Sequence, residues 1–164
     1  MASDHSFDIV SEIDLQELRN ALEQTRKELA VRYDFKDVPT EIKQEEKQLI
    51  ITTADEYKLK AVRDILESKL LRRGLDLKIL SEPKNESATQ NQIRSTILLV
   101  SGVSAEKAKA INKLLHDMFP KIRPTIQGET IRVVAKSIDE LQAAIDLLKN
   151  SPQIDLPLQF INYR

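Results

Sequence analysis

Cationic side chains on predicted strands are the groups of this chain best suited to bind a phosphate. Arg132 and Lys136 lie four residues apart, so an extended strand presents both on one face. A guanidinium held there can bind a phosphate through two parallel hydrogen bonds. Arg94 lies in another predicted strand, and Arg164 directly follows the last one. The competing interpretation is that these cations are solvated surface charges paired with acidic neighbours such as Glu129.

Aromatic side chains next to basic ones could hold a nucleotide base. Arg32, Phe35 and Lys36 lie in the run Arg-Tyr-Asp-Phe-Lys, a mixture that suits a base and its phosphate. Phe7 and Phe160, on the first and last predicted strands, are further candidates. The competing interpretation is that such rings fill the ends of a hydrophobic core. Apart from Phe7, the predicted central strands carry no aromatic residue, so the stacking platform of sheet-type RNA-binding domains is missing.

Catalytic groups with a sensible spacing are absent from the sequence. There is no Gly-rich phosphate loop, no paired metal motif and no cysteine, and His5 and His116 are isolated from each other. Acylphosphatases hold phosphate with an arginine in the loop after their first strand, but the matching residues 11–14 and 101–104 contain none. We therefore predict a protein that is not an enzyme and needs no cofactor or metal.

Residues 121–140 predict the unit that positions Arg132 and Lys136. β-branched residues flank Gly128, which can adopt the positive φ of a short hairpin turn. Ser137, with a glutamate three residues later, is typical of a capped helix start. The pattern is strand, strand, helix, and it recurs 84 positions earlier, where Thr53 and Glu56 would form the same capping pair.

Hydrophobic periodicity extends this repeat over the chain. It predicts helices over residues 15–31, 55–73, 104–118 and 138–148, and strands over residues 7–13, 39–43, 48–52, 75–80, 93–100, 122–126, 130–134 and 158–163. Residues 97–100 are apolar on both faces, which indicates a strand buried on both sides.

The order of elements predicts an α+β protein with two ferredoxin-like (βαββαβ) domains. Each would have an antiparallel sheet with both helices on one face and strand order 4-1-3-2. The domains would span residues 1–82 and 93–164, with a linker over residues 83–92. The strand over residues 6–13 could pair in either sheet, because two similar halves present similar edges. Pro39, Pro124 and Pro157 fall in or beside predicted edge strands, where a missing N–H is tolerated.

Composition and charge narrow the choice of partners. The chain of 164 residues is 41% hydrophobic and 31% charged, with no apolar run long enough for a membrane span. Residues 1–6 have neither the basic start nor the apolar segment that is typical of a targeting signal. We expect a cytoplasmic protein with no membrane contact. Residues 1–81 hold 14 basic and 17 acidic side chains, and residues 82–164 hold 11 and 9. Such a mild charge does not favour binding to long duplex nucleic acid.

Several motifs together resemble the bacterial YajQ family of nucleotide-binding proteins, over nearly the entire chain. They are Phe-Asp-Ile-Val-Ser-Glu at 7–12, Arg-Tyr-Asp-Phe-Lys at 32–36, Leu-Leu-Arg-Arg-Gly at 70–74, Ile-Gln-Gly at 126–128, Ile-Arg-Val at 131–133, Glu-Leu-Gln at 140–142, and Gln-Phe-Ile-Asn-Tyr at 159–163. The resemblance implies two ferredoxin-like domains, a cytosolic location and nucleotide binding without catalysis. It also implies cyclic di-GMP and RNA as ligands to consider.

Three hypotheses of function follow. The first is a non-enzymatic nucleotide-binding protein, a sensor of cyclic di-GMP or an RNA-associated regulator. Its site residues would be Phe7, Arg32, Phe35, Lys36, Arg94, Arg132, Lys136, Phe160 and Arg164. The second is a protein interaction module without a small ligand. The third is RNA binding whose affinity falls steeply with salt.

Overall fold

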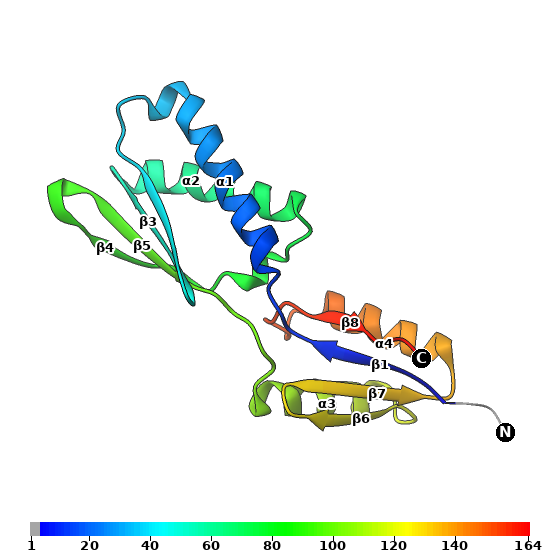
Figure 1. Ribbon diagram of the computed structural model, residues 1–164. Coiled ribbons are helices and arrows are strands. Elements are labelled where there is room, and N and C mark those ends of the chain that lie inside the picture. The colour runs from blue at the N-terminus through cyan, green and yellow to red at the C-terminus, as the bar shows by residue number, and fades with distance from the viewer. Residues whose placement is uncertain (1–3) are drawn as a thin grey trace. The chain divides into compact units, whose positions relative to one another are not determined.

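The computed structural model describes residues 4–164 as two four-stranded antiparallel sheets with helices packed against each (Figure 1). The elements are β1 (His5–Val10), α1 (Leu15–Val31), η1 (Tyr33–Phe35), β2 (Glu41–Glu45), β3 (Gln48–Thr53), α2 (Glu56–Arg72), η2 (Leu77–Ile79), β4 (Lys84–Ser87), η3 (Thr89–Asn91), β5 (Ile93–Leu98), α3 (Ala105–Met118), β6 (Arg123–Gln127), β7 (Thr130–Ala135), α4 (Ile138–Asn150) and β8 (Gln159–Ile161). The η elements are short 3₁₀ helices.

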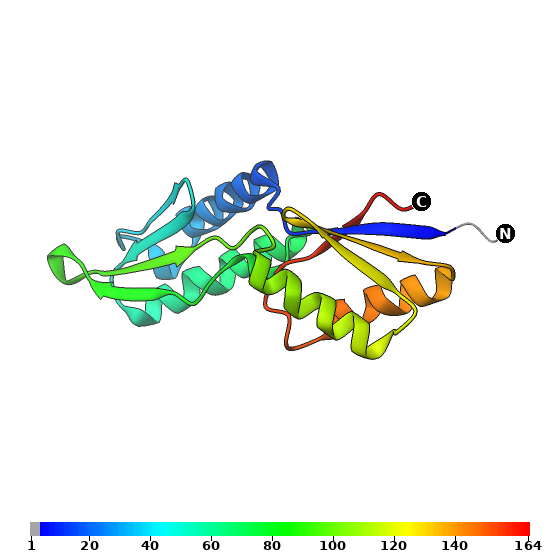
Figure 2. The ribbon, with the colours of Figure 1, turned by 90° about the horizontal axis from the view of Figure 1, so that it is seen from below.

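One compact unit combines the two ends of the chain. The segment that ends at Glu12 joins Ser101–Arg164, and the sheet has the order β6-β7-β1-β8. Along this unit the elements run β1, α3, β6, β7, α4, β8, so the sheet has the ferredoxin-like order 4-1-3-2 read from β8. Helices α3 and α4 lie together on one face of this sheet (Figure 2). We call this the terminal unit.

The other unit is the continuous segment Ile13–Val100, which we call the middle unit. Its sheet has the order β2-β3-β5-β4, and α1 and α2 pack on one face. The spatial order is again ferredoxin-like, but β5 fills the position of the first strand although it is the last strand of this unit in sequence. The fold class predicted from the sequence is therefore confirmed, with a circularly permuted order of elements in the middle unit.

The division between the units differs from the predicted one. Residues 83–92, predicted as a linker, contain β4 and the turn to β5, and β4 pairs with β5. β5 pairs with β3 of the middle unit, whereas β1 pairs with β7 and β8. The boundaries lie near residues 12 and 100 because the two halves have exchanged their central strands. Residues 75–80, predicted as a strand, form η2 and a single bridge between Leu80 and Leu99.

The charge difference between residues 1–81 and residues 82–164 does not carry over to the two units. The terminal unit carries 9 basic and 10 acidic side chains, and the middle unit carries 16 of each. Neither unit is basic as a whole. Any binding of phosphate must therefore depend on a local group of cations.

Capping residues start the helices where the pattern indicates, with one exception. Asp14, Ser104 and Ser137 accept hydrogen bonds from backbone N–H groups in the first turns of α1, α3 and α4. Thr53, predicted to cap the second helix, is fully buried and bonds the Thr40 hydroxyl at 2.9 Å. Asp55 takes the cap of α2 instead. The two helix starts are thus not equivalent, although the strands before them are.

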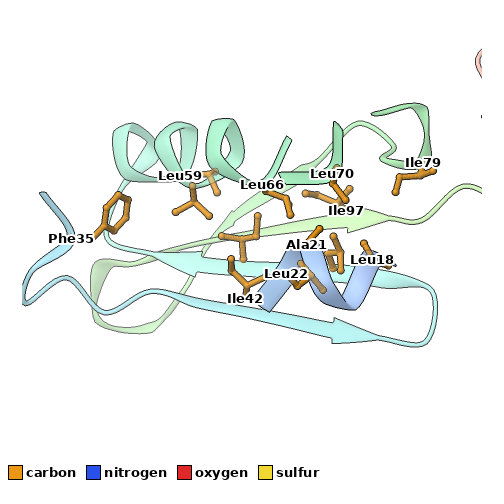
Figure 3. Close-up of a cluster of buried hydrophobic side chains, with 13 residues drawn as sticks. Leu18, Ala21, Leu22, Phe35, Ile42, Leu59, Leu66, Leu70, Ile79 and Ile97 are labelled. Carbon is orange, nitrogen blue, oxygen red and sulfur yellow. The ribbon is translucent and has the colours of Figure 1, made fainter. Parts of the chain in front are cut away.

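The core of the middle unit lies between its sheet and its helix pair (Figure 3). It consists of Leu18, Ala21, Leu22, Phe35, Ile42, Leu49, Ile51, Leu59, Val62, Leu66, Leu70, Ile79 and Ile97. The terminal unit buries the corresponding side chains Phe7, Ile9, Ile111, Leu115, Ile131, Val133, Leu141, Ile145 and Leu148. Each large apolar side chain buried in this way contributes about 1.5–3 kcal/mol.

Two further predictions concern the prolines on edge strands and the burial of residues 97–100. Pro124 lies in β6, and Pro39 and Pro157 precede β2 and β8, which are all edge strands. The edge prediction is therefore confirmed. The strand at 97–100 is not buried on both sides, since Ile97 is fully buried and Leu98 is 56% exposed. Only one face of each sheet is covered by helices, so Leu98 points to the open face.

Candidate functional site

The predicted site residues are divided between the two units. Phe7, Arg132, Lys136, Phe160 and Arg164 belong to the terminal unit, and Arg32, Phe35, Lys36 and Arg94 belong to the middle unit. The nine residues therefore form two groups, and each unit has to be considered by itself.

The rings predicted to contact a base are mostly core residues. Phe7 is fully buried, with ring centroids 5.8 Å from Phe160 and 6.2 Å from Tyr163. The Lys149 ammonium lies 5.8 Å from the Phe160 ring centroid. Phe7 faces α4 because it is paired with buried Val133 on β7. The Phe7 ring is therefore not exposed to an incoming base in this structure, and a contact between Phe7 and a base stays a prediction.

The segment from Arg32 to Lys36 closes one end of the middle unit. Phe35 is 6% exposed, and the cations of Arg32 and Lys58 lie 5.9 and 5.0 Å from its ring centroid. The Arg32 guanidinium donates two hydrogen bonds to Asp34, at 2.9 and 2.8 Å, and thereby lowers the pKa of that carboxyl. Phe35 therefore fills the core, as the competing interpretation predicted, and Arg32 is already paired. Lys36 remains exposed.

Arg94 lies on the open face of the middle sheet. It is paired across the strands with Glu86, and its guanidinium is 3.6 Å from that carboxylate. The Arg94 and Glu86 side chains are both nearly half exposed. This is a surface ion pair of small energy, and no second cation of the predicted set joins it.

A buried carboxylate organises the open face of the terminal sheet. Asp8 is 5% exposed and accepts hydrogen bonds from the Arg132 Nε at 3.0 Å and from the Asn162 amide at 2.9 Å. Asn162 has a φ of 56°, and beyond it Ser6 and Arg164 exchange two backbone hydrogen bonds. Asp8 therefore joins β7, β1 and the C-terminal segment. Arg132, predicted to hold a phosphate, has this structural partner instead.

Replacing Asp8 by asparagine should destabilise the terminal unit in a pH-dependent way. The Arg132 hydrogen bonds lower the pKa of Asp8, Asn162 adds to this, and burial acts in the opposite direction. A carboxyl whose pKa is lower in the folded state contributes stability above its unfolded pKa of about 3.9, and this stability is lost as the pH falls through the folded pKa. Urea unfolding at pH 7, 5 and 3 should show the difference between wild type and Asp8→Asn shrinking at pH 3. Asp117→Asn, at an exposed position of α3 in the same unit, is the control, and an Asp8→Asn effect equal at all three pH values would contradict the assignment.

A basic hollow of about 650 Å³ lies beside the first turn of α4. Its lining residues are Asp4, Lys121, Arg123, Ala135, Lys136, Ser137 and Glu140. Lys121 and Arg123 precede or begin β6 and Lys136 follows β7, so the antiparallel hairpin brings these cations together. Arg123 is 2.9 Å from Asp4, whereas Lys121 and Lys136 have no ion-pair partner among residues 4–164.

An apolar hollow of about 290 Å³ lies on the other side of the same helix turn. Its lining residues are His5, Ser6, Ile138, Leu141, Gln142, Ile145, Tyr163 and Arg164. Asp4 lines the basic hollow, and its neighbour His5 lines the apolar one. In the same way, Ser137 lines the basic hollow and Ile138 lines the apolar one. The two hollows therefore flank one point of the terminal unit. Ile138 and Tyr163 are 62% and 64% exposed, so an apolar surface is available there.

Sequence reasoning found part of this arrangement. Lys136 and Arg164 were predicted and lie in the two hollows. Lys121, Arg123 and Tyr163 were missed. For Lys121 and Arg123, the available signal was a cation at each outer end of the predicted hairpin, because the outer ends of two paired antiparallel strands lie side by side.

Two kinds of feature are absent from residues 4–164. No three His, Cys, Asp or Glu side chains are grouped so that they could share a metal ion. No helix in this range has the length and hydrophobicity required to cross a bilayer.

Known proteins are similar to this chain over its whole length. A family model described as "Nucleotide-binding protein YajQ-like" matches residues 5–164. A "Nucleotide-binding protein" of Synechococcus sp. (strain JA-3-3Ab) is 51% identical over 166 residues, covering 100% of both chains. Proteins with the same name are 47% identical in Roseiflexus castenholzii (strain DSM 13941 / HLO8), with 100% of both chains covered, and in Heliobacterium modesticaldum (strain ATCC 51547 / Ice1), with 100% of this chain and 99% of the other.

Proposed function

The chain belongs to the family of YajQ-like nucleotide-binding proteins, and we propose that it binds a nucleotide at the start of α4 in the terminal unit. The observation that carries this proposal is the basic hollow with an apolar hollow directly beside it. A nucleotide has the same division into a charged phosphate part and a flat, largely apolar base. The volumes of the hollows suit a small ligand.

Phosphate groups would lie against Lys121 and Lys136, whose charges are unpaired among the described residues. The free N–H groups at the start of α4 and the positive end of its helix dipole would stabilise a negative charge beside these two lysines. The Ser137 hydroxyl already accepts the N–H of Glu140, at 3.3 Å. Backbone donors nearer the start of the helix would therefore serve the ligand.

The base would lie in the apolar hollow against Tyr163 and Ile138. Tyr163 packs its ring near Phe7, which fixes one side of the ring and leaves 64% of the residue exposed. Stacking of a base on an aromatic side chain contributes about 1–3 kcal/mol. Arg164 at the same hollow can meet a second phosphate, as a cyclic dinucleotide would require. Cyclic di-GMP is therefore the first ligand to test.

Titration calorimetry with cyclic di-GMP, GTP and ATP tests the proposal. The double variant Lys121→Gln and Lys136→Gln should weaken binding at least tenfold, which corresponds to about 1.4 kcal/mol. The variant Lys109→Gln and Lys113→Gln removes the same charge from exposed positions of α3 that line neither hollow, and it should bind as wild type does. Equal affinity of the two double variants, or no saturable binding of any nucleotide to the wild type, would refute the site.

RNA and a partner protein are the competing ligands in this proposal. RNA binding would show an affinity that falls steeply between two salt concentrations, and the nearly neutral charge of both units does not favour it. A partner protein is favoured by one observation: Val31, Tyr33 and Tyr57 are each more than 80% exposed. The proposal includes that the protein binds its ligand without catalysing a reaction and that it does so in the cytoplasm.

A further inference from the structure

A second cationic hollow lies in the middle unit, between α1 and α2. It has a volume of about 640 Å³ and is lined by four basic side chains, Lys27, Lys69, Arg72 and Arg73, and by two acidic ones, Glu17 and Glu28. It belongs to the continuous segment Ile13–Val100 and shares no residue with the two hollows at α4. The site proposed above therefore does not account for it.

The positive charges in this hollow exceed the negative ones. Lys69 is the most enclosed, with a side chain 12% exposed and its Nζ 3.0 Å from a Glu28 oxygen. The other Glu28 oxygen is 3.8 Å from Arg32, so one carboxylate serves two cations. Arg73 lies 3.8 Å from Glu17. Two cations are left uncompensated.

Those two cations are Lys27 and Arg72, one from each helix. Neither has an ion pair or side-chain hydrogen bond within residues 4–164. They line a common hollow, in which Lys69 and Arg73 are each already paired with a glutamate. Like charges gathered at a concave surface raise the local concentration of anions.

The helix dipole explains only part of this group of cations. Basic residues are common at helix C-termini, because they can bond the last free carbonyl groups. Here the N–H of Arg73 bonds the carbonyls of Lys69 and Leu70 at 3.1 Å, and the N–H of Gly74 bonds that of Leu71 at 3.0 Å. The backbone therefore satisfies these carbonyls without the side chains. Lys27 lies on α1 and has no connection with the end of α2.

We propose that the α1–α2 hollow binds a compact polyphosphate, an anion with two or three linked phosphoryl groups. Such an anion offers many oxygen acceptors to donors arranged on two helices, and Arg72 can bind two of them at once. The hollow of about 640 Å³ has room for a chain of phosphoryl groups, and its two uncompensated cations suit an anion with more than one negative charge. The occupant is the polyphosphate itself, whether free or part of a nucleoside triphosphate, and this site is independent of the one at α4.

Titration calorimetry with sodium tripolyphosphate tests this site. The protein used carries Lys121→Gln and Lys136→Gln, so the α4 site does not contribute and failure of either proposal is seen separately. Further change of Lys27→Gln and Arg72→Gln should weaken tripolyphosphate binding at least tenfold. The matched pair Lys43→Gln and Lys60→Gln removes two exposed cations of the same unit that do not line this hollow, and it should leave binding unchanged.

Competition with ATP distinguishes the two sources of the anion. If tripolyphosphate and ATP bind with equal affinity, the phosphate chain alone is recognised, as proposed. The proposal is overturned if tripolyphosphate does not bind saturably, or if both pairs of substitutions have the same effect. Circular dichroism melting of each variant shows whether it is folded, and the exposed positions of Lys27 and Arg72 make unfolding unexpected.

Discussion

Deleting residues 1–12 is expected to unfold the terminal unit and to leave residues 13–100 folded. β1 lies between β7 and β8, so its removal takes away the central strand and separates β8 from the rest of the sheet. The buried side chains Phe7 and Ile9 would be lost with it. The middle unit contains all of its own strands in one continuous segment. Amide NMR spectra of the truncated chain should show dispersed signals only from residues 13–100.

Adding β1 back as a separate peptide provides the control. A peptide of residues 4–12 should restore the signals of the terminal unit in a saturable manner, because it supplies both the backbone hydrogen bonds and the two core side chains. The same peptide with Phe7→Ala and Ile9→Ala should not restore them. A dispersed, cooperatively melting fragment of residues 101–164 alone would contradict the strand exchange seen in the structure.

Substituting Phe7 by alanine should destabilise the terminal unit by about 3–5 kcal/mol. The ring is fully buried and contacts the rings of Phe160 and Tyr163, so its removal leaves a cavity in the sheet-to-helix core. Urea unfolding followed by NMR signals of each unit measures the change separately. The free energy of unfolding of residues 13–100 should stay the same, although Phe7 precedes that segment in the chain.

Tyr33→Ala is the matched control for an aromatic truncation. Tyr33 is 89% exposed, and its loss should change the free energy of unfolding by no more than about 0.5 kcal/mol. A Phe7→Ala variant that weakens nucleotide binding without loss of stability would instead support the original prediction that Phe7 contacts a base. Loss of stability in the middle unit would show that β1 belongs there.

Local features of the fold could be predicted from the sequence because they depend on neighbours in the chain. Asp14 and Ser137 cap the helices as predicted, since a cap bonds N–H groups within three residues. Gly128 has the positive φ that its turn requires. The edge prolines were informative for the same reason, because the missing N–H is a property of the residue itself. Thr53 failed as a cap because Thr40, distant in sequence, competes for its hydroxyl.

Strand partners and the candidate site were decided only by the tertiary structure. β1 and β5 are both short, half-apolar strands, and backbone hydrogen bonds are the same for every sequence, so either could complete either sheet. Which sheet each strand joins depends on the packing of all the side chains of the sheet at once. The sequence by itself determined two ferredoxin-like sheets with helices on one face and named Arg132 and Lys136 as neighbours. Only the fold showed that Asp8 holds Arg132 on the open face, because a buried carboxylate requires a paired cation. Only the fold showed, too, that Lys136 lies beside Lys121 at the ends of a hairpin, because strand pairing brings together residues that are far apart in the chain.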